Sequence, residues 1–300
     1  MVLLRRLALA SLVANVVIVI TGGAVRLTGS GLGCPTWPKC TDQSYVTTSS
    51  MGVHGVIEFG NRMLGGIVGL IAVATLLVVL VGRQRRLIGP AVLVAAGVAV
   101  QGAVGGLSVR TELNPWVVAG HFLLSMGVLA AAYVLWRRVS PVGRDPVPGA
   151  VRGLAVALTG AALLVLALGT VVTGSGPHAG DENARRLGYD PQTVAQLHAD
   201  AVFLLIGLSI AAWFALRAVG ARTAARAAMV LLAVELAQGA IGFTQYALHL
   251  PVVLVALHMA GACAVWLATL DVLARVGRPT AVPEPRTTAA ESAPLAAADR

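Results

Sequence analysis

Eight apolar segments, each about 20 residues long, occupy most of this 300-residue sequence and limit what it can fold into. They lie at residues 7–26, 54–82, 90–109, 116–136, 153–173, 195–216, 227–247 and 251–274. A helix needs about 20 consecutive apolar residues to cross the hydrocarbon core of a bilayer. The sequence therefore predicts an all-α membrane protein with eight transmembrane helices.

The overall composition agrees with this prediction. Apolar residues make up 57% of the chain and charged residues only 12%, against about 25% charged residues in a typical soluble domain. The first apolar segment follows Arg5-Arg6 and resembles a secretory signal, but no clear small-residue cleavage site comes after it. We expect it to be retained as the first spanning helix.

Basic residues predict the orientation of the chain. Of its 22 Lys and Arg residues, 16 fall on one side of the predicted membrane. Six lie on the other side or at its helix mouths: Arg26, Lys39, Arg62, Arg110, Arg185 and Arg186. The positive-inside rule then places both termini in the cytoplasm. The net charge of +9 is a topology signal with some attraction for anionic lipid, so it needs no nucleic acid to explain it.

The second half of the sequence repeats the first. Gln-Gly-Ala-Val-Gly at 101–105 recurs as Gln-Gly-Ala-Ile-Gly at 238–242, an offset of 137 positions. His121 and His258 are separated by the same offset. Four spans per half make the two repeats parallel, so we expect two similar four-helix bundles.

The offset also pairs Asn61 with His198. We divide the chain into an N-terminal bundle (1–145), a C-terminal bundle (146–275) and a cytoplasmic tail (276–300). The tail is poor in bulky apolar residues, and we expect it to be disordered.

The C-terminal half carries a pair of intramembrane histidines, His198 and His258. Their spans are the second and fourth of the half, so the two imidazoles can meet at one depth. Two facing imidazoles suit axial ligation of a haem iron between helices. Zinc fits less well, because no third or fourth ligand of the usual types clusters nearby. The alternative for each histidine is a hydrogen bond between helices.

The N-terminal half departs from this pattern. It keeps His121 but has Asn61, a weak iron ligand, in place of the second histidine. His54, Glu58, Asn61 and Arg62 follow one another at i, i+4, i+7 and i+8, along one stripe of a helix. We interpret this stripe as a reaction site in which Arg62 can pair with haem carboxylates. The alternative is a simple ion pair between Glu58 and Arg62.

Two cysteines, Cys34 and Cys40, lie in the first outer loop. A cysteine pair outside the cytoplasm usually oxidises to a disulfide, although a redox-active thiol pair is an alternative. Cys263 falls inside a span and fits an ordinary buried residue. Glu235 is an intramembrane carboxyl group, one turn from Gln238, and can relay protons.

Together these features resemble the haem A synthase family. The resemblance covers residues 5 to 275 and rests on the Cys34–Cys40 loop, the segment Glu58-Phe59-Gly60-Asn61-Arg62, and the spacing of His121, His198 and His258. It implies an enzyme that converts haem O into haem A, the cofactor of aa3-type terminal oxidases. In that reaction the C8 methyl group of the porphyrin is oxidised to a formyl group.

The resemblance also implies how the sites are divided. A cofactor haem b would bind His198 and His258, a substrate haem would bind at His121 and Asn61, and Glu58 would take part in catalysis. Better-known members have a histidine where this chain has Asn61. The substrate haem would then have His121 as its one protein ligand, or His54 would supply the second.

Two other functions compete with this one. A di-haem cytochrome that only transfers electrons would favour two intact histidine pairs, whereas a haem exporter would suit the parallel repeats. The enzyme is expected in the cell membrane, with haem O as substrate and the haem O-forming enzyme and oxidase assembly factors as partners. The sequence leaves open the electron donor, the source of the formyl oxygen and whether the chain forms homo-oligomers.

Overall fold

The computed structural model describes residues 2–277, and this part of the chain contains eight long helices. They are α1 (Val2–Leu27), α2 (Gly52–Val81), α3 (Arg85–Arg110), α4 (Pro115–Val139), α5 (Gly149–Ser175), α6 (Pro191–Ala218), α7 (Arg222–Ala247) and α8 (Val252–Arg275). All eight are long and apolar enough to cross a membrane. The predicted all-α, eight-helix membrane fold is therefore confirmed.

Most helices extend beyond the apolar segments that predicted them, because their ends are polar. Helix α3 begins at Arg85, five residues before the expected start at 90. It tolerates Pro90 in its second turn, although proline has no N–H to donate to the carbonyl of Arg86. The Arg138 guanidinium donates to that carbonyl oxygen instead, so the backbone acceptor keeps a partner.

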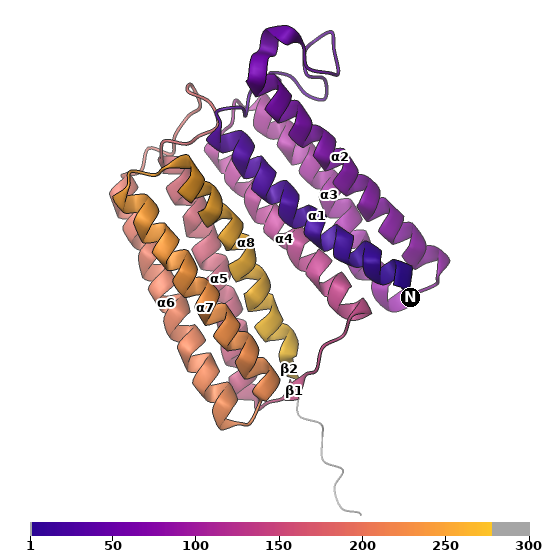
Figure 1. Ribbon diagram of the computed structural model, residues 1–300, viewed down its shortest axis with the longest axis vertical. Helices are drawn as coiled ribbons and strands as arrows, with labels where there is room; N and C mark the ends of the chain where they lie inside the picture. The colour runs from indigo at the N-terminus through magenta and orange to yellow at the C-terminus, as the bar shows by residue number, and fades with distance from the viewer. Residues whose placement is uncertain (1, 278–300) are drawn as a thin grey trace, which may run out of the picture.

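The helices form two bundles of four, α1–α4 and α5–α8 (Figure 1). Within each bundle every helix packs against the next, and the first packs against the fourth. The second and fourth helices are thus diagonal to each other in both bundles. The bundles meet where α1 and α4 pack against α8, and α4 also packs against α5.

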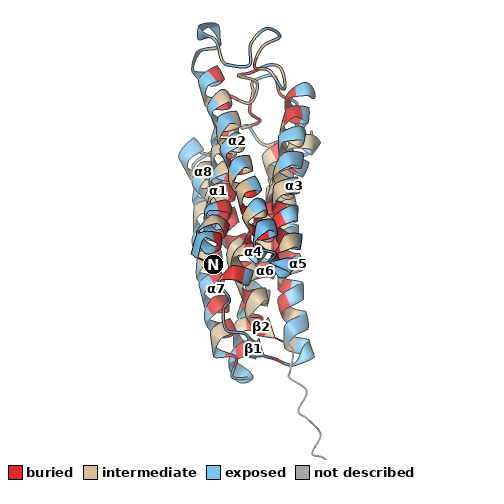
Figure 2. Cartoon of the chain, turned by 90° about the vertical axis from the view of Figure 1, so that its right-hand side faces the viewer, coloured by how far each residue is buried: buried red, intermediate tan, exposed pale blue. Residues whose placement is uncertain are grey.

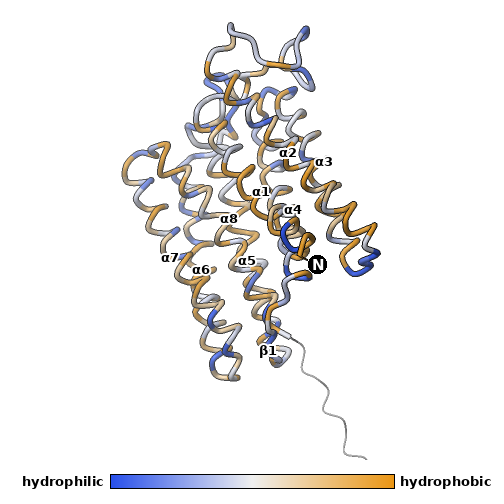
Figure 3. Tube along the Cα trace, turned by 45° about the vertical axis from the view of Figure 1, so that its right-hand side comes forward, coloured by the Kyte–Doolittle hydropathy of each residue, from blue (hydrophilic) through white to orange (hydrophobic). Residues whose placement is uncertain are grey.

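Apolar side chains cover the outside of the bundles. Figure 2 shows exposed residues along the outward faces of the helices, and Figure 3 shows mainly hydrophobic residues along the helices between more polar ends. Leu70 is 72% exposed and Phe203 57% exposed. Water would penalise such a surface, whereas lipid tails solvate it, so the outward faces fit a bilayer.

Polar contacts join the two halves near the end where α1 begins. Asp271 of α8 accepts hydrogen bonds from Tyr133 (2.7 Å) and from Arg137 of α4. Deeper in the interface, the indole N–H of Trp266 donates to the carbonyl oxygen of Met126 at 2.9 Å. These bonds fix α8 against α4.

The opposite end is joined through the outer loops. Arg26, at the end of α1, donates to the carbonyl oxygens of His178 (2.7 Å) and Thr173 (3.0 Å) in the second half. The backbone N–H of Gly31 donates to Gly180 at 2.8 Å. The halves are therefore tied at both ends of the interface.

Two short strands were not predicted. β1 (Asp145–Pro146) and β2 (Val276–Gly277) pair in parallel. The expectation that disorder begins at residue 276 is therefore wrong for Val276 and Gly277, because β1 supplies a partner for their backbone. The rest of the predicted tail, 278–300, lies outside the described residues.

Candidate functional site

Two of the helices that carry candidate histidines, α4 and α6, begin at polar caps. α4 starts at Pro115 after Asn114, whose side chain accepts from the N–H of Trp116 at 3.0 Å. α6 starts at Pro191 after Asp190, whose carboxylate accepts from the N–H of Thr193 at 2.8 Å. A polar cap followed by proline is a strong helix-start signal, so these caps fix where each helix enters the membrane.

His198 of α6 and His258 of α8 face each other across the C-terminal bundle. Their ring centres are 6.5 Å apart and their planes make an angle of 73°. Two metal–nitrogen bonds of about 2 Å, plus roughly 1 Å from each nitrogen to its ring centre, would separate two axial imidazoles by about 6 Å. The spacing therefore fits one metal ion between the rings.

The packing around the pair agrees with this fit. Among the described residues, Nδ1 of His198 and Nδ1 of His258 are both buried and make no hydrogen bond. The ring of His198 lies against α5, where a Cβ on Gly169 would come within 3.2 Å of Cε1. Among the described residues, the two imidazoles also make no hydrogen bond to each other, so a histidine–histidine hydrogen bond does not explain why they face each other.

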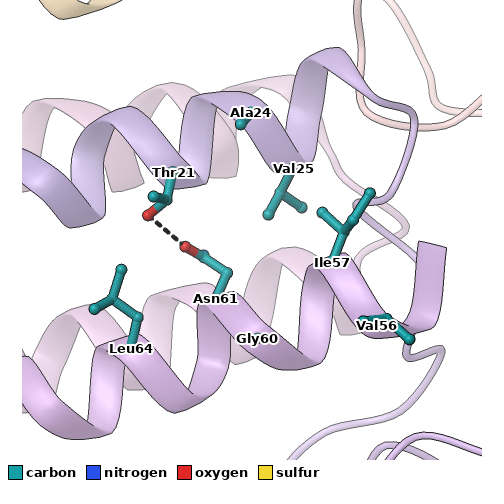
Figure 4. Close-up of a pocket in the computed structure, with 8 residues that line it drawn as sticks. All are labelled: Thr21, Ala24, Val25, Val56, Ile57, Gly60, Asn61 and Leu64. Carbon is teal, nitrogen blue, oxygen red and sulfur yellow. Dashed lines mark hydrogen bonds between the residues drawn. The ribbon is translucent and has the colours of Figure 1, made fainter. Parts of the chain in front are cut away.

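The N-terminal bundle has a different pair. His121 of α4 also has a buried Nδ1 without a partner in the described chain. Asn61, on the diagonal helix α2, is held through its side-chain oxygen, which accepts from the hydroxyl of Thr21 at 2.8 Å (Figure 4). This contact joins α1 to α2 and fixes the carboxamide.

A pocket of about 310 Å³ lies between α1 and α2 beside this hydrogen bond (Figure 4). Its lining is almost entirely apolar: Thr21, Ala24, Val25, Val56, Ile57, Gly60, Asn61 and Leu64. The N-terminal bundle therefore has apolar space next to the position where the histidine pair is broken.

Glu58 lies on the same helix but is bound to the cysteine loop. Its side chain is buried, with the residue 6% exposed. Oε2 accepts from the backbone N–H of Cys34 at 2.5 Å, and Oε1 accepts from Arg62 at 2.6 Å. Cys34 and Cys40 form a disulfide, as predicted. The carboxylate thus connects α2 to the closed loop.

Arg62 uses all its donors on Glu58 and the same loop. Two of its five N–H groups donate to Glu58. The other three donate to the carbonyl oxygens of Cys34, Thr36 and Lys39 at 3.0 to 3.1 Å. In this conformation no N–H of Arg62 remains for a haem carboxylate, and the predicted contact between Arg62 and the porphyrin would require the loop to release it.

His54 points toward the outer loops. Its Nδ1 is 2.9 Å from the hydroxyl of Ser30. The imidazole lines a second, more polar pocket of about 440 Å³ that also includes Asp181 and Glu182 of the second outer loop. The stripe seen in the sequence is therefore divided. Glu58 and Arg62 bind the first loop, Asn61 binds α1, and His54 lies with the loops.

Thr21 was not singled out from the sequence. Thr-Gly-Ser-Gly occurs close to the end of the first helix of each half, at 28–31 and at 173–176, so the first helices are offset by 145 positions and Thr21 pairs with Leu166. The hydroxyl that binds the carboxamide of Asn61 in one half is therefore replaced by a leucine at the equivalent position of the other half. This difference between the two halves is the sequence signal that could have identified Thr21.

The intramembrane carboxyl group of Glu235 has a single partner. Its Oε1 accepts from Ser209 of α6 at 2.8 Å, and its Oε2 is buried with no partner among the described residues. Gln238, one turn away, binds elsewhere, to the backbone of His258. A proton relay through Glu235 stays a prediction.

Residues 5–270 match the COX15-CtaA family of cytochrome oxidase assembly proteins. The chain belongs to this family. A protein from Bradyrhizobium sp. (strain ORS 278) named "Heme A synthase" is 30% identical to it over 310 aligned positions, which cover 83% of this chain and 84% of that protein. A protein of the same name from Rhizobium etli (strain CFN 42) is 29% identical, with 85% and 84% covered.

In this member of the COX15-CtaA family, the disulfide closes the loop that holds Glu58 and Arg62. We predict that the double variant Cys34→Ser/Cys40→Ser has a lower melting temperature and a lower haem content than the wild type but keeps some activity. Without the disulfide the loop is less rigid. It therefore holds the backbone N–H of Cys34 less firmly against Glu58, and its carbonyl oxygens less firmly against Arg62. Thermal unfolding and haem quantification check this prediction.

Cys263→Ser is the matched control, because Cys263 is a buried free cysteine of α8, outside the loop. Alkylation and mass analysis of the oxidised wild type should find no free thiol at Cys34 or Cys40. Unchanged melting and haem content in the double variant would show that the loop does not depend on the bond.

Proposed function

We propose that this chain is a membrane oxidoreductase that oxidises the C8 methyl group of haem O to a formyl group, producing haem A for aa3-type terminal oxidases. The observation that carries the proposal is that the two bundles offer different side chains to a haem. One bundle has a facing histidine pair, and the other has one histidine, an asparagine and a carboxylate. The relatives named "Heme A synthase" support the reaction.

We assign His198 and His258 to a cofactor haem b. The 6.5 Å spacing of their rings supports this assignment. Haem b bound there would pass electrons one at a time. The protein's own contribution is to supply two fixed imidazoles and an apolar surround, which set the ligand field and limit access of water.

We assign the substrate haem to His121 and Asn61 in the N-terminal bundle. His121 of α4 would hold the haem iron, and the Thr21 hydroxyl keeps the Asn61 carboxamide in place on the diagonal helix α2. Because a carboxamide is a weak iron ligand, this side stays accessible to a small molecule. An accessible axial side suits oxidation, whereas a closed pair suits electron transfer.

Glu58 is the catalytic candidate. Three N–H donors, one from Cys34 and two from Arg62, already hold its oxygens, but each carboxylate oxygen has more than one lone pair. It can therefore accept a proton as the methyl carbon is oxidised, or stabilise positive charge that develops there. Arg62 and the N–H of Cys34 position it and keep it at the mouth of the bundle.

The orientation of the chain indicates the side of the membrane on which the reaction occurs. The positive-inside rule places the cysteine loop outside the cytoplasm, so we place both haem sites toward the outer surface of the membrane. Haem O would be received from the enzyme that forms it, and the product would pass to the assembling oxidase. Neither a pure electron-transfer cytochrome nor a haem exporter accounts for a buried carboxylate at Glu58 when the equivalent position in the other half, 195, is alanine.

The first test concerns the cofactor site. We predict that His198→Ala and His258→Ala each abolish the low-spin haem b spectrum of the purified protein, because one imidazole cannot complete a six-coordinate iron. Absorption and EPR spectra provide the measurement, with His178→Ala, in the outer loop, as the control. A wild-type spectrum in either variant would show that the cofactor lies elsewhere.

The second test concerns catalysis. Glu58→Gln keeps the size of the side chain but removes its charge, so haem b should still bind. We expect conversion of haem O to fall by about a hundredfold, the scale of a lost acid–base or electrostatic group. Haem A formed in cells that also make haem O is measured by extraction and chromatography.

A matched control for this substitution is Glu235→Gln, which alters an intramembrane carboxyl group in the other bundle. Near wild-type haem A production by Glu58→Gln would make Glu58 a structural anchor of the loop and remove it from catalysis.

A further inference from the structure

The repeated Gln-Gly-Ala-[Val/Ile]-Gly segment makes the same contact in both bundles. In the second, Nε2 of Gln238 on α7 donates to the backbone carbonyl oxygen of His258 on α8 at 2.5 Å. In the first, Nε2 of Gln101 on α3 donates to the carbonyl oxygen of His121 on α4 at 3.1 Å. Each glutamine thus binds the backbone of the candidate ligand on the neighbouring helix.

Such a bond acts on the position of the histidine. The carbonyl of a helical residue already accepts from the N–H four residues later and has a second lone pair for another donor. A side-chain donor from the adjacent helix fixes both the depth and the rotation of that helical turn. Inside a bilayer, water does not compete for the bond.

The last glycine of each segment contacts the imidazole ring itself. It lies four residues after the glutamine, on the same face of the helix. A Cβ on Gly242 would be 3.2 Å from Cε1 of His258, and one on Gly105 would be 3.5 Å from Cε1 of His121. The second residue of each segment is also glycine, but a Cβ on Gly239 or Gly102 would meet nothing within 4 Å.

Neighbouring residues also fit the side chains of the two glutamines. A Cβ on Gly261 of α8 would be only 2.0 Å from Oε1 of Gln238, so that glycine provides the room in which the carboxamide lies. In the first bundle Ser125 extends the contact. It accepts from Gln101 at 2.6 Å and donates to the carbonyl of His121 at 3.0 Å.

We propose that Gln238 with Gly242, and Gln101 with Gly105, are positioning residues for the haem ligands His258 and His121. The glutamine sets the depth and rotation of the ligand's helical turn, and the glycine sets the orientation of its ring. This inference rests on the proposed function, because it takes the two histidines as iron ligands.

The test uses the whole protein with haem b bound. Gln238→Met keeps the length of the side chain without a donor, and Gly242→Ala adds the Cβ that presses on the ring. Both should shift the low-spin EPR signal, which responds to the angle between the two imidazole planes, and the midpoint potential of haem b. Gly239→Ala adds a methyl group to the same helix in open space and should leave both unchanged.

Gln101→Met is the control from the other bundle. It should leave the haem b signal unchanged and weaken the binding of added haem O by about tenfold, the effect of losing roughly one hydrogen bond. If Gln238→Met does not fold, Gly242→Ala still decides the question. Wild-type EPR signals and potentials in the folded variants, or equal shifts in Gly239→Ala, would overturn the proposal.

Failure of this proposal can be distinguished from failure of the proposed function. Loss of haem b in His258→Ala together with a wild-type signal in Gly242→Ala would reject the positioning role alone. Retention of haem b in His258→Ala would reject the ligand assignment on which both depend.

Discussion

The diagonal placement of the second and fourth helices in each bundle is the constraint on which both candidate sites depend. α6 and α8 pack against α5 and α7, and this arrangement leaves His198 and His258 facing each other at 6.5 Å. The same arrangement places α2, which carries Asn61, diagonal to α4, which carries His121. A parallel repeat thus produces two equivalent positions, and the side chains at those positions decide what each can bind.

Three departures from the repeat lie close together in the N-terminal bundle. Asn61 replaces the histidine found at 198, Glu58 corresponds to Ala195, and Thr21 corresponds to Leu166. Two of them interact directly, since Thr21 donates to Asn61. A group needed only to hold a porphyrin should occur in both halves. The departures therefore support a division in which the second half transfers electrons and the first performs the oxidation.

The fold and the facing of His198 and His258 could be predicted because their signals are local or repeated. Each spanning helix is determined by about 20 apolar residues, and an offset of 137 identifies equivalent residues without any contact information. The partners of Arg62 could not be predicted, because they are carbonyl oxygens of a loop whose path depends on the Cys34–Cys40 disulfide. The contact between Gln238 and His258 likewise depends on the relative depth of two helices. The pairing of Val276 with Asp145 joins segments far apart in the sequence.

The central claim is that one bundle holds a cofactor haem and the other processes haem O. Haem extraction from the purified protein, made in cells with and without the haem O-forming enzyme, tests it most directly. The account predicts haem b alone without that enzyme, and haem b together with haem O or haem A when it is present. Haem b alone under both conditions would contradict the account and indicate an electron-transfer cytochrome, and little bound haem under either would contradict it in favour of a transporter.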